Sequence, residues 1–231
     1  MMIEVLHLPY DKKGIFIERI NRFVARVVVG NEVVEAHIHD TGRLSELLYK
    51  GNSILLKRAK NSKRRTKWDI IAAFFDGEWI LTNSSYHSEI FKNTIEKVPM
   101  FKRRGFNITK EVKFGKSRLD FQLREDEKRI LVEVKGCTLR KKDVALFPDA
   151  PTLRGVRHIY ELIEGIKKGY NAWLVFVVMH KKARCFAPNE ETDRAFKDAF
   201  YTAIKKGVLV LPLKYFYDAE RIYYIEEIPL C

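Results

Sequence analysis

Cysteine is scarce in this 231-residue chain, which has only Cys137, Cys185 and Cys231. They are far apart and show no Cys-x-x-Cys spacing, so the sequence predicts neither a disulfide framework nor a zinc site. The first residues show no basic segment followed by an apolar run, so we expect no signal peptide. The longest apolar run, residues 172–179, is too short to span a bilayer. We therefore expect a cytoplasmic protein with no membrane partner.

Acidic residues are few relative to basic ones. The chain has 30 Asp and Glu against 43 Lys and Arg, a formal net charge of +13. A surplus of this size indicates a polyanionic partner, although it bears on association and not on the fold. Because no basic amphipathic helix suited to a membrane surface stands out, we expect DNA as the partner, ahead of RNA. The sequence leaves the oligomeric state open, a homodimer included.

Internal repeats and low-complexity linkers are also absent, and hydrophobic residues make up 46% of the chain, enough for a buried core. The order of elements predicts an N-terminal domain at residues 1–82 and a C-terminal domain at residues 83–231. The first reads as an OB-like β-barrel and the second as an α/β domain with a mixed sheet. In the first we expect strands at 14–17, 23–29, 32–38, 53–56, 68–75 and 78–81 and a short helix at 44–48. In the second we expect helices at 84–95, 152–168 and 193–206 and strands at 107–113, 172–178 and 208–211.

One stretch, residues 118–135, predicts a β-hairpin. Apolar and polar residues alternate at 118–123 and again at 131–135, which is typical of strands with one buried face. The segment between them is too polar for a core, and we place the turn at Asp126-Glu127.

This register places Asp120 directly opposite Glu133 on one face, and Arg118 opposite Lys135. Directly opposed Cα atoms in an antiparallel pair lie roughly 4.5–5.5 Å apart, so the two carboxylates repel each other unless a cation lies between them. Mg²⁺ suits such a pair, since it binds through one or two carboxylates and takes waters and substrate phosphates as its other ligands. We therefore interpret Asp120, Glu133 and Lys135 as catalytic, and the two acids as ligands of Mg²⁺ or Mn²⁺.

An acid, a turn and then Glu-x-Lys resembles the core of PD-(D/E)xK nucleases, where Lys135 would orient a water or steady a phosphate. The tripeptide alone is a weak signal, because it recurs at residues 111–113. The alternative is an amphipathic hairpin whose exposed face carries a cross-strand salt bridge. The sequence does not decide whether a third acid joins the metal site. The candidates are Glu89 and Glu96 on the predicted helix before the hairpin and Glu111 on the strand before it.

Basic residues cluster at several places outside the hairpin. The loop at residues 57–68 has seven cationic and no acidic residues, and its Trp68 either stacks on a base or belongs to the core. His37 and His39 share a strand face without a third ligand nearby, and we expect no metal there. The candidate nucleic-acid contacts are Arg43, Lys63, Arg64, Arg65, Lys67, Arg103, Arg104, Arg118, Arg154 and His158. For His158 the alternative is an ordinary helix-surface residue.

Several motifs together resemble the sugar fermentation stimulation protein (SfsA) family, in the family's order and over nearly the whole chain. They lie at residues 21–23, 41–43, 112–115, 117–121, 132–135, 147–150 and 154–158. The Phe-Pro-Asp-Ala and Arg-Gly-x-x-His motifs are far more specific than Glu-x-Lys. The resemblance implies DNA binding, an OB-like N-terminal domain and a PD-(D/E)xK, restriction-endonuclease-like C-terminal domain.

Two segments depart from the family pattern. Gly136-Cys137 stands where Asn-Val is common, and residues 37–40 stand where the family often has His-Cys-Pro-Asn. Neither departure touches the three candidate catalytic residues.

From the residues and the resemblance we expect a DNA-binding protein with a metal-dependent phosphodiesterase site, linked to the regulation of sugar metabolism. The alternative is a non-enzymatic DNA-binding transcriptional regulator with an inactive nuclease fold, because a fold can be kept without its activity. A third reading is an RNA-processing nuclease.

Overall fold

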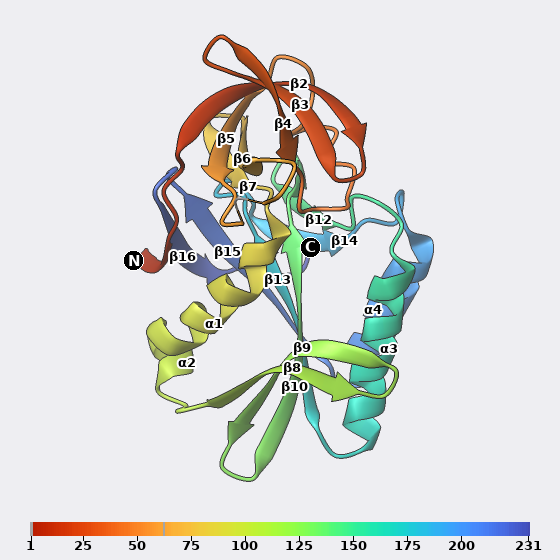
Figure 1. Cartoon of the computed structure of the whole chain (residues 1–231). Coiled ribbons are helices and arrows are strands. Elements are labelled where there is room, and N and C mark those ends of the chain that lie inside the picture. Colours follow the sequence, from red (N-terminus) through yellow and green to blue (C-terminus); the bar gives the residue numbers. More distant parts are fainter. Residues whose placement is uncertain (1, 62) are drawn as a thin grey trace.

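The structure is a computed structural model that describes residues 2–61 and 63–231, so Met1 and Ser62 of the basic loop lie outside the described residues. In the described N-terminal part, five strands form a closed barrel in the order β4-β3-β2-β5-β6 (Figure 1). The ring closes where β4 pairs in parallel with β6. The strands are β2 Lys12–Asn21, β3 Val24–Val29, β4 Glu32–His37, β5 Ser53–Arg58 and β6 Trp68–Phe75, followed by β7 Glu78–Leu81.

A mixed sheet forms the C-terminal part and is continuous with the barrel, because β7 pairs with β15 at Trp79 and Tyr217. Its centre is three parallel strands, β10, β13 and β15. The antiparallel strands β9 and β8 extend one side, and β16 and β1 extend the other. The bounds are β1 Ile3–His7, β8 Asn107–Phe114, β9 Ser117–Glu125, β10 Lys128–Cys137, β13 Asn171–Val178, β15 Leu209–Tyr217 and β16 Arg221–Glu227.

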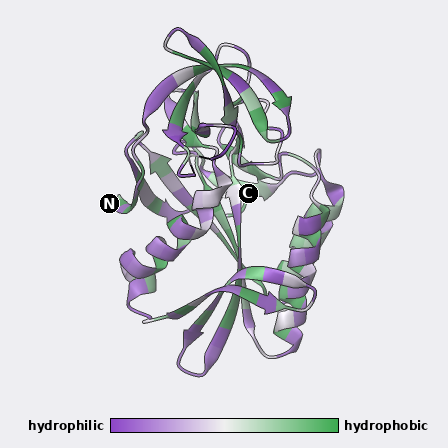
Figure 2. Cartoon of the chain, viewed as in Figure 1, coloured by the Kyte–Doolittle hydropathy of each residue, from purple (hydrophilic) through white to green (hydrophobic). Residues whose placement is uncertain are grey.

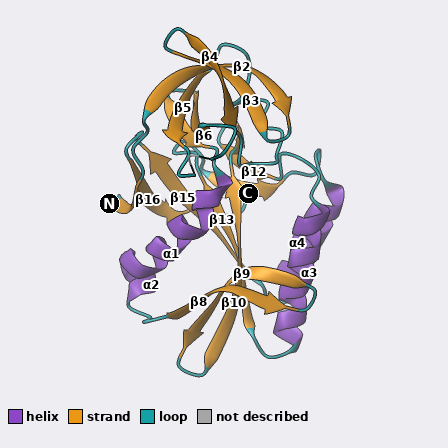
Figure 3. Cartoon of the chain, in the orientation of Figure 1, coloured by secondary structure: helices purple, strands orange, loops and turns teal. Residues whose placement is uncertain are grey.

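Helices cover both faces of the mixed sheet (Figure 3). One face carries η1 Ser84–Tyr86, α1 His87–Lys97 and α2 Pro99–Lys102, and the other carries α3 Leu153–Lys167 and α4 Arg194–Lys205. Thr152 and Asp193 cap α3 and α4, since their side chains accept hydrogen bonds from the N–H groups of Gly155 (3.0 Å) and Phe196 (2.9 Å). A small separate sheet has strands β11 Leu139–Lys141, β12 Val144–Phe147 and β14 Cys185–Pro188.

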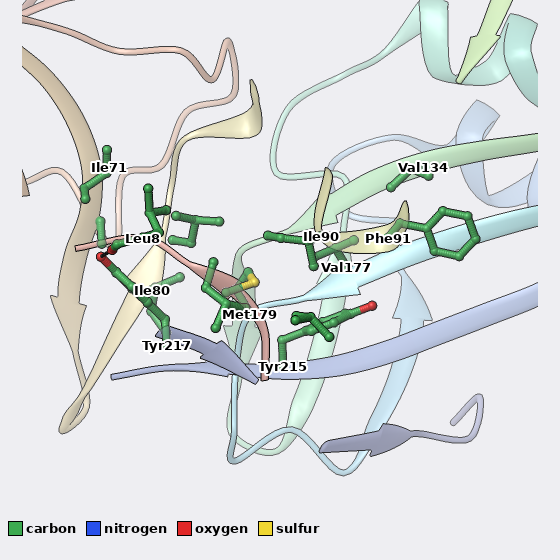
Figure 4. Close-up of a cluster of buried hydrophobic side chains, with 14 of the residues drawn as sticks. Leu8, Ile71, Ile80, Ile90, Phe91, Val134, Val177, Met179, Tyr215 and Tyr217 are labelled. Carbon is green, nitrogen blue, oxygen red and sulfur yellow. Dashed lines mark hydrogen bonds between the residues drawn. The ribbon is translucent and has the colours of Figure 1, made fainter. Parts of the chain in front are cut away.

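Two clusters of buried side chains lie on the two sides of the mixed sheet. The first is shared with the barrel: Ile71 of β6 and Ile80 of β7 belong to the same cluster as Ile90 of α1 and Tyr215 of β15 (Figure 4). The second fills the space under α3 and α4. Figure 2 shows hydrophobic and hydrophilic residues mixed along these two helices, as expected for helices with one buried face. The shared first cluster fixes the barrel against the sheet.

The predicted architecture is confirmed, with element ends shifted by a few residues. The helix predicted at 44–48 is wrong, because this segment makes a single turn in which Leu48 N–H donates to Leu44 O at 2.7 Å. Leu44 has a φ of 50°, which lies outside the right-handed helical region. The short strands β1, β11, β12, β14 and β16 were not predicted.

The expectation of no disulfide is also wrong. Cys185 and Cys231 form a disulfide with their Cα atoms 5.2 Å apart. Phe186 brings the two segments together, because it forms a β-bridge with Leu230 and its carbonyl accepts from Cys231 N–H at 3.0 Å. This contact joins segments that are 46 residues apart, which cysteine spacing alone does not reveal. Cys137 is a free, buried thiol.

The first strand of the chain belongs to the C-terminal sheet. β1 pairs with β16 from Ile3 with Tyr224 to His7 with Arg221, although the sequence assigned residues 3–7 to the first domain. The boundary between residues 82 and 83 stays a prediction. No helix in the described ranges is long and apolar enough to cross a membrane.

Candidate functional site

The hairpin predicted from the sequence is present, and its register is confirmed over the paired stretch. The backbone turns at Asp126, where φ is 51°, and the ladder runs as far as Phe121 paired with Val132. One more step in the same register places Asp120 opposite Glu133, as predicted.

The ladder stops there because the Asp120 side chain takes a backbone partner on β10. Asp120 Oδ2 accepts a hydrogen bond from Val134 N–H at 2.8 Å, and Oδ1 accepts one from Ser88 Oγ at 3.3 Å. The carboxylate is therefore fixed both to β10 and to the first turn of α1.

The ladder between β9 and β10 ends before Arg118, so the predicted pairing of Arg118 with Lys135 stays a prediction; on its other side Arg118 pairs with Lys113 of β8. One detail of the predicted hairpin is wrong. The hairpin has no bare polar face, because Leu119 packs under α3 whereas Phe121 packs under α1. The site is thus covered by helices on both sides of the sheet, which a two-stranded pattern does not reveal.

Glu133 is buried and held by two neighbouring side chains. Lys135 Nζ lies 2.5 Å from Glu133 Oε1, and His158 Nδ1 of α3 contacts the same oxygen. Burial opposes the ionisation of Glu133, but Lys135 and His158 outweigh it and lower the pKa of this carboxyl below its ordinary value. Glu133 therefore carries its negative charge at neutral pH.

Asp120 is shifted in the opposite direction. Burial and the charge of Glu133 raise the pKa of Asp120 to about 6, against the opposing effects of the Val134 hydrogen bond and of Lys135. Neighbouring carboxylates whose pKa values are pushed apart are typical of functional sites.

The carboxylate pair fits a divalent cation. Among the described residues Glu133 Oε2 is buried without a hydrogen-bond partner; a cation between the acids would coordinate this oxygen and offset the charge of Glu133, which together with burial raises the Asp120 pKa. Within residues 2–61 and 63–231, no three His, Cys, Asp or Glu side chains are grouped to hold a metal ion. A cation at Asp120 and Glu133 would therefore take waters and phosphate oxygens as its remaining ligands, a set that suits Mg²⁺ or Mn²⁺.

The three acids left open as a third ligand lie elsewhere. Glu96 forms an ion pair with Lys92 at 2.5 Å, and Glu111 forms one with Arg118 at 3.2 Å. Glu89 lines a cavity beside the basic loop.

Two residues of α1 that the sequence did not single out adjoin the site. Ser88 contacts Asp120, as described above. His87 packs on Gly136, where an added Cβ would lie 1.9 Å from the imidazole ring, so glycine is required after Lys135. Burial lowers the pKa of His87 to about 4 and keeps it neutral. The only sequence feature that pointed to this contact was Gly136, which departs from the family pattern. Nothing in the sequence links Gly136 to His87.

The prediction that His158 contacts DNA directly is wrong. Its side chain is 2% exposed and bonds Glu133 through Nδ1, while Arg154 Nε lies 3.4 Å from Nε2 on the other side of the ring. His158 is therefore a positioning residue for Glu133, and Arg154 is the exposed end of this chain of contacts.

The cations of the basic loop have different surroundings. Lys63, Arg65 and Lys67 are exposed, whereas Arg64 is half-buried and bonded to Asp69 at 2.8 Å. Trp68 packs against the first core cluster, with the Arg58 guanidinium 5.9 Å from its ring centroid. The core interpretation of Trp68 is thus favoured over base stacking.

The remaining candidate contacts are dispersed. Arg43, Arg103 and Arg118 are exposed. Arg104 forms two hydrogen bonds with Glu125, at 2.7 and 2.5 Å, near the turn of the hairpin. The structure therefore brings Asp120, Glu133 and Lys135 together and does not gather all of the predicted cations around them.

A closed OB barrel joined to a restriction-endonuclease-like domain, with an acid pair and a lysine where two strands part, is the class of protein that this fold and site define. Two family models match the chain: "SfsA N-terminal OB domain" at residues 17–82 and "Sugar fermentation stimulation protein RE domain" at residues 85–221. The chain belongs to the sugar fermentation stimulation protein family.

Several relatives span nearly the whole chain. A "Sugar fermentation stimulation protein homolog" from Methanothermobacter thermautotrophicus is 46% identical over 92% of this chain and 88% of its own length. The homolog from Thermotoga neapolitana is 42% identical over 98% of both chains. The solved structure of Pyrococcus furiosus SfsA, described as a complex with Ca²⁺, matches with a TM-score of 0.92 and 27% identity over 99% of both chains.

Proposed function

We propose that this protein binds DNA and hydrolyses its phosphodiester bonds with Mg²⁺ or Mn²⁺ held by Asp120 and Glu133. One observation carries the proposal: two carboxylates with separated pKa values lie beside the ammonium group of Lys135. The description of the Pyrococcus furiosus relative as a Ca²⁺ complex supports a divalent cation in this fold. The family name suggests a link with sugar metabolism, and we propose that it acts through DNA.

Each residue of the site would have a separate role in hydrolysis. The metal ion, when bound, supplies Lewis-acid stabilisation of the charge on the scissile phosphate. Lys135 orients the attacking water and offsets negative charge that develops in the transition state. His158 holds Glu133 in place, and Ser88 with Val134 N–H holds Asp120.

DNA binding is supported by the position of the basic loop. Lys60 and Arg64 of the loop line a cavity of about 350 Å³ together with Ser85, just before α1. Ser88 in the next turn bonds Asp120. A strand that follows the loop would therefore reach the candidate site along the start of α1.

The second candidate is a DNA-binding regulator without nuclease activity. It is favoured by the contacts of Lys135 and His158 with Glu133, which hold this carboxylate in place and lower its pKa against the effect of burial without a metal ion.

The test is the variant Lys135→Ala, matched with Lys113→Ala in the second, exposed Glu-x-Lys tripeptide. If Lys135 acts in the transition state, its loss should lower the cleavage rate by roughly 10²–10³ and leave DNA affinity within a few-fold of the parent. Lys113→Ala should change neither quantity. Cleavage of labelled DNA with Mg²⁺ or Mn²⁺ and binding with EDTA measure the two effects.

Two outcomes contradict the nuclease proposal. No cleavage by the purified parent with either metal ion would favour the regulator. Cleavage at equal rates by the parent and Lys135→Ala would indicate a contaminating enzyme.

A further inference from the structure

A cavity of about 430 Å³ lies between the barrel and the start of α3. Its lining includes Thr41, Gly42 and residues 147–150, which belong to two sequence motifs that the proposed nuclease chemistry does not use. Asp149 joins the two segments, because its Oδ2 accepts from the N–H of Leu44, just after the first motif, at 3.0 Å. An added Cβ on Gly42 would lie 2.4 Å from the Asp149 carboxylate, which explains the glycine between Thr and Arg.

The barrel side of this cavity is fixed in place. The Arg19 guanidinium donates to the carbonyls of Gly42 (2.7 Å), Arg43 (2.9 Å) and Asp40 (3.1 Å). It also donates to the carbonyl of Arg22 at 2.8 Å, and so joins two segments that line the cavity. The cavity is therefore preformed, which lowers the cost of binding a ligand.

The two rims of the cavity repeat one combination of side chains. Arg22-Phe23 lies on the barrel rim and Leu153-Arg154 lies on the α3 rim. Leu153 is 87% exposed and Phe23 is 47% exposed. Single exposed apolar residues are ordinary, but two that flank one cavity, each followed or preceded by an arginine, indicate a ligand with an apolar face and negative charges.

The remaining lining shows how such a ligand would be oriented. Asp40 and Asp149 line the cavity between the rims. Burial raises the pKa of both carboxyls, and a phosphate placed beside them would be repelled when they ionise. Carboxylates instead accept hydrogen bonds from the amino group of a base. The phosphates of a nucleotide would therefore lie at Arg22 and Arg154, and its base between the rims.

The cavity adjoins the candidate catalytic site. Arg154 Nε lies 3.4 Å from His158 Nε2, and the other nitrogen of His158 contacts Glu133. A strand held by Arg154 would thus pass within one turn of α3 of the residue that positions Glu133.

We propose that this cavity binds one unpaired nucleotide of the DNA strand held at Glu133, with its base between Phe23 and Leu153 and its phosphates on Arg22 and Arg154. The inference rests on the proposed function and names its substrate class, DNA that is single-stranded or locally unpaired. A base in an intact duplex would first have to leave the stack, and that unstacking lowers the affinity for fully paired DNA.

The test uses the full chain, in EDTA, and three DNA probes: a single strand, a paired duplex, and a duplex with one unpaired 2-aminopurine. Fluorescence anisotropy gives the affinities, and 2-aminopurine emission reports whether that base is transferred to the protein. The parent should bind both unpaired probes more tightly than the duplex and should change the 2-aminopurine emission.

Phe23→Ala and Leu153→Ala remove the apolar rims, and Leu209→Ala is the control, because Leu209 is 47% exposed on β15 and does not line this cavity. Loss of base stacking should weaken binding of the unpaired probes about 5- to 100-fold and abolish the emission change, with duplex affinity unchanged. Leu209→Ala should behave like the parent, and circular dichroism checks folding.

Each other outcome has one meaning. Equal affinity of the parent for paired and unpaired DNA, without a change in emission, would overturn this inference and leave DNA binding intact. A preference for unpaired DNA that persists in both rim variants would place the base elsewhere and also overturn it. No binding to any probe would overturn the proposed function itself.

Discussion

At the scale of single residues, Asp120 has surroundings that oppose its ionisation. Its pKa is raised from an ordinary 3.8 to about 6, by burial and by Glu133. Between about pH 4 and 6 the folded protein holds a proton that the unfolded chain has released. The free energy of unfolding contributed by Asp120 therefore falls as the pH rises through this window.

Asp120→Asn removes this dependence and keeps an acceptor for Val134 N–H. Above pH 6 the variant should be more stable than the parent in metal-free buffer, by about 1–3 kcal/mol, and the difference should vanish near pH 4. Urea titrations of both proteins from pH 4 to 8 measure it. A constant difference across this range would mean that Asp120 is not electrostatically strained.

Only some side chains of the candidate site could be predicted from the sequence. Asp120, Glu133 and Lys135 were identified because strand alternation and turn length determine which side chains lie opposite each other. His158, Ser88 and His87 lie near them only after α1 and α3 pack on opposite faces of the sheet. The burial of His158 depends on that packing, which explains why it was mistaken for a surface contact.

At the scale of elements, the basic loop between β5 and β6 has a narrower role than its composition suggests. Arg64 is bonded to Asp69 within the fold. Lys63 is exposed, and Arg65, whose side chain is 85% exposed, forms a surface pair with Glu35 at 3.1 Å. Surface pairs of this kind are weak, so Lys63 and Arg65 can bind phosphates.

We expect the double variant Lys63→Ala/Arg65→Ala to weaken DNA binding and to flatten the slope of log affinity against log salt, by up to about two. Lys167→Ala/Lys205→Ala, in the last turns of α3 and α4, removes the same charge away from the loop and should leave the slope unchanged. If both pairs flatten it equally, net charge and not the loop determines binding.

The predicted elements were those with a clear local pattern of apolar residues. β13 is a continuous apolar run buried on both faces, and α3 has an apolar stripe behind its Thr152 cap. The segment 44–48 also has helical composition, but Leu44 takes a left-handed conformation where Asp149 accepts from its N–H. That contact spans 105 residues and overrides the local preference.

At the scale of the whole molecule, the disulfide between Cys185 and Cys231 closes a loop of 46 residues. In the chain-entropy model, a loop of this length stabilises the fold by about 4 kcal/mol. Cys185→Ala/Cys231→Ala should lower the free energy of unfolding by an amount up to this value, as should reduction of the parent. Urea unfolding with and without dithiothreitol measures both changes, and reductant should have no effect on the double variant.

The pairing of β1 with β16 has a consequence for biosynthesis. The barrel strands β2 to β6 are made close together, so the barrel can close while later parts of the chain are still being translated. β1 leaves the ribosome before them, but its partner begins at Arg221, near the other end of the chain. Until β16 has been made, β1 is therefore a strand without its partner, and such strands associate readily with other chains. We infer that this first segment is open to association with other chains until β16 has been made.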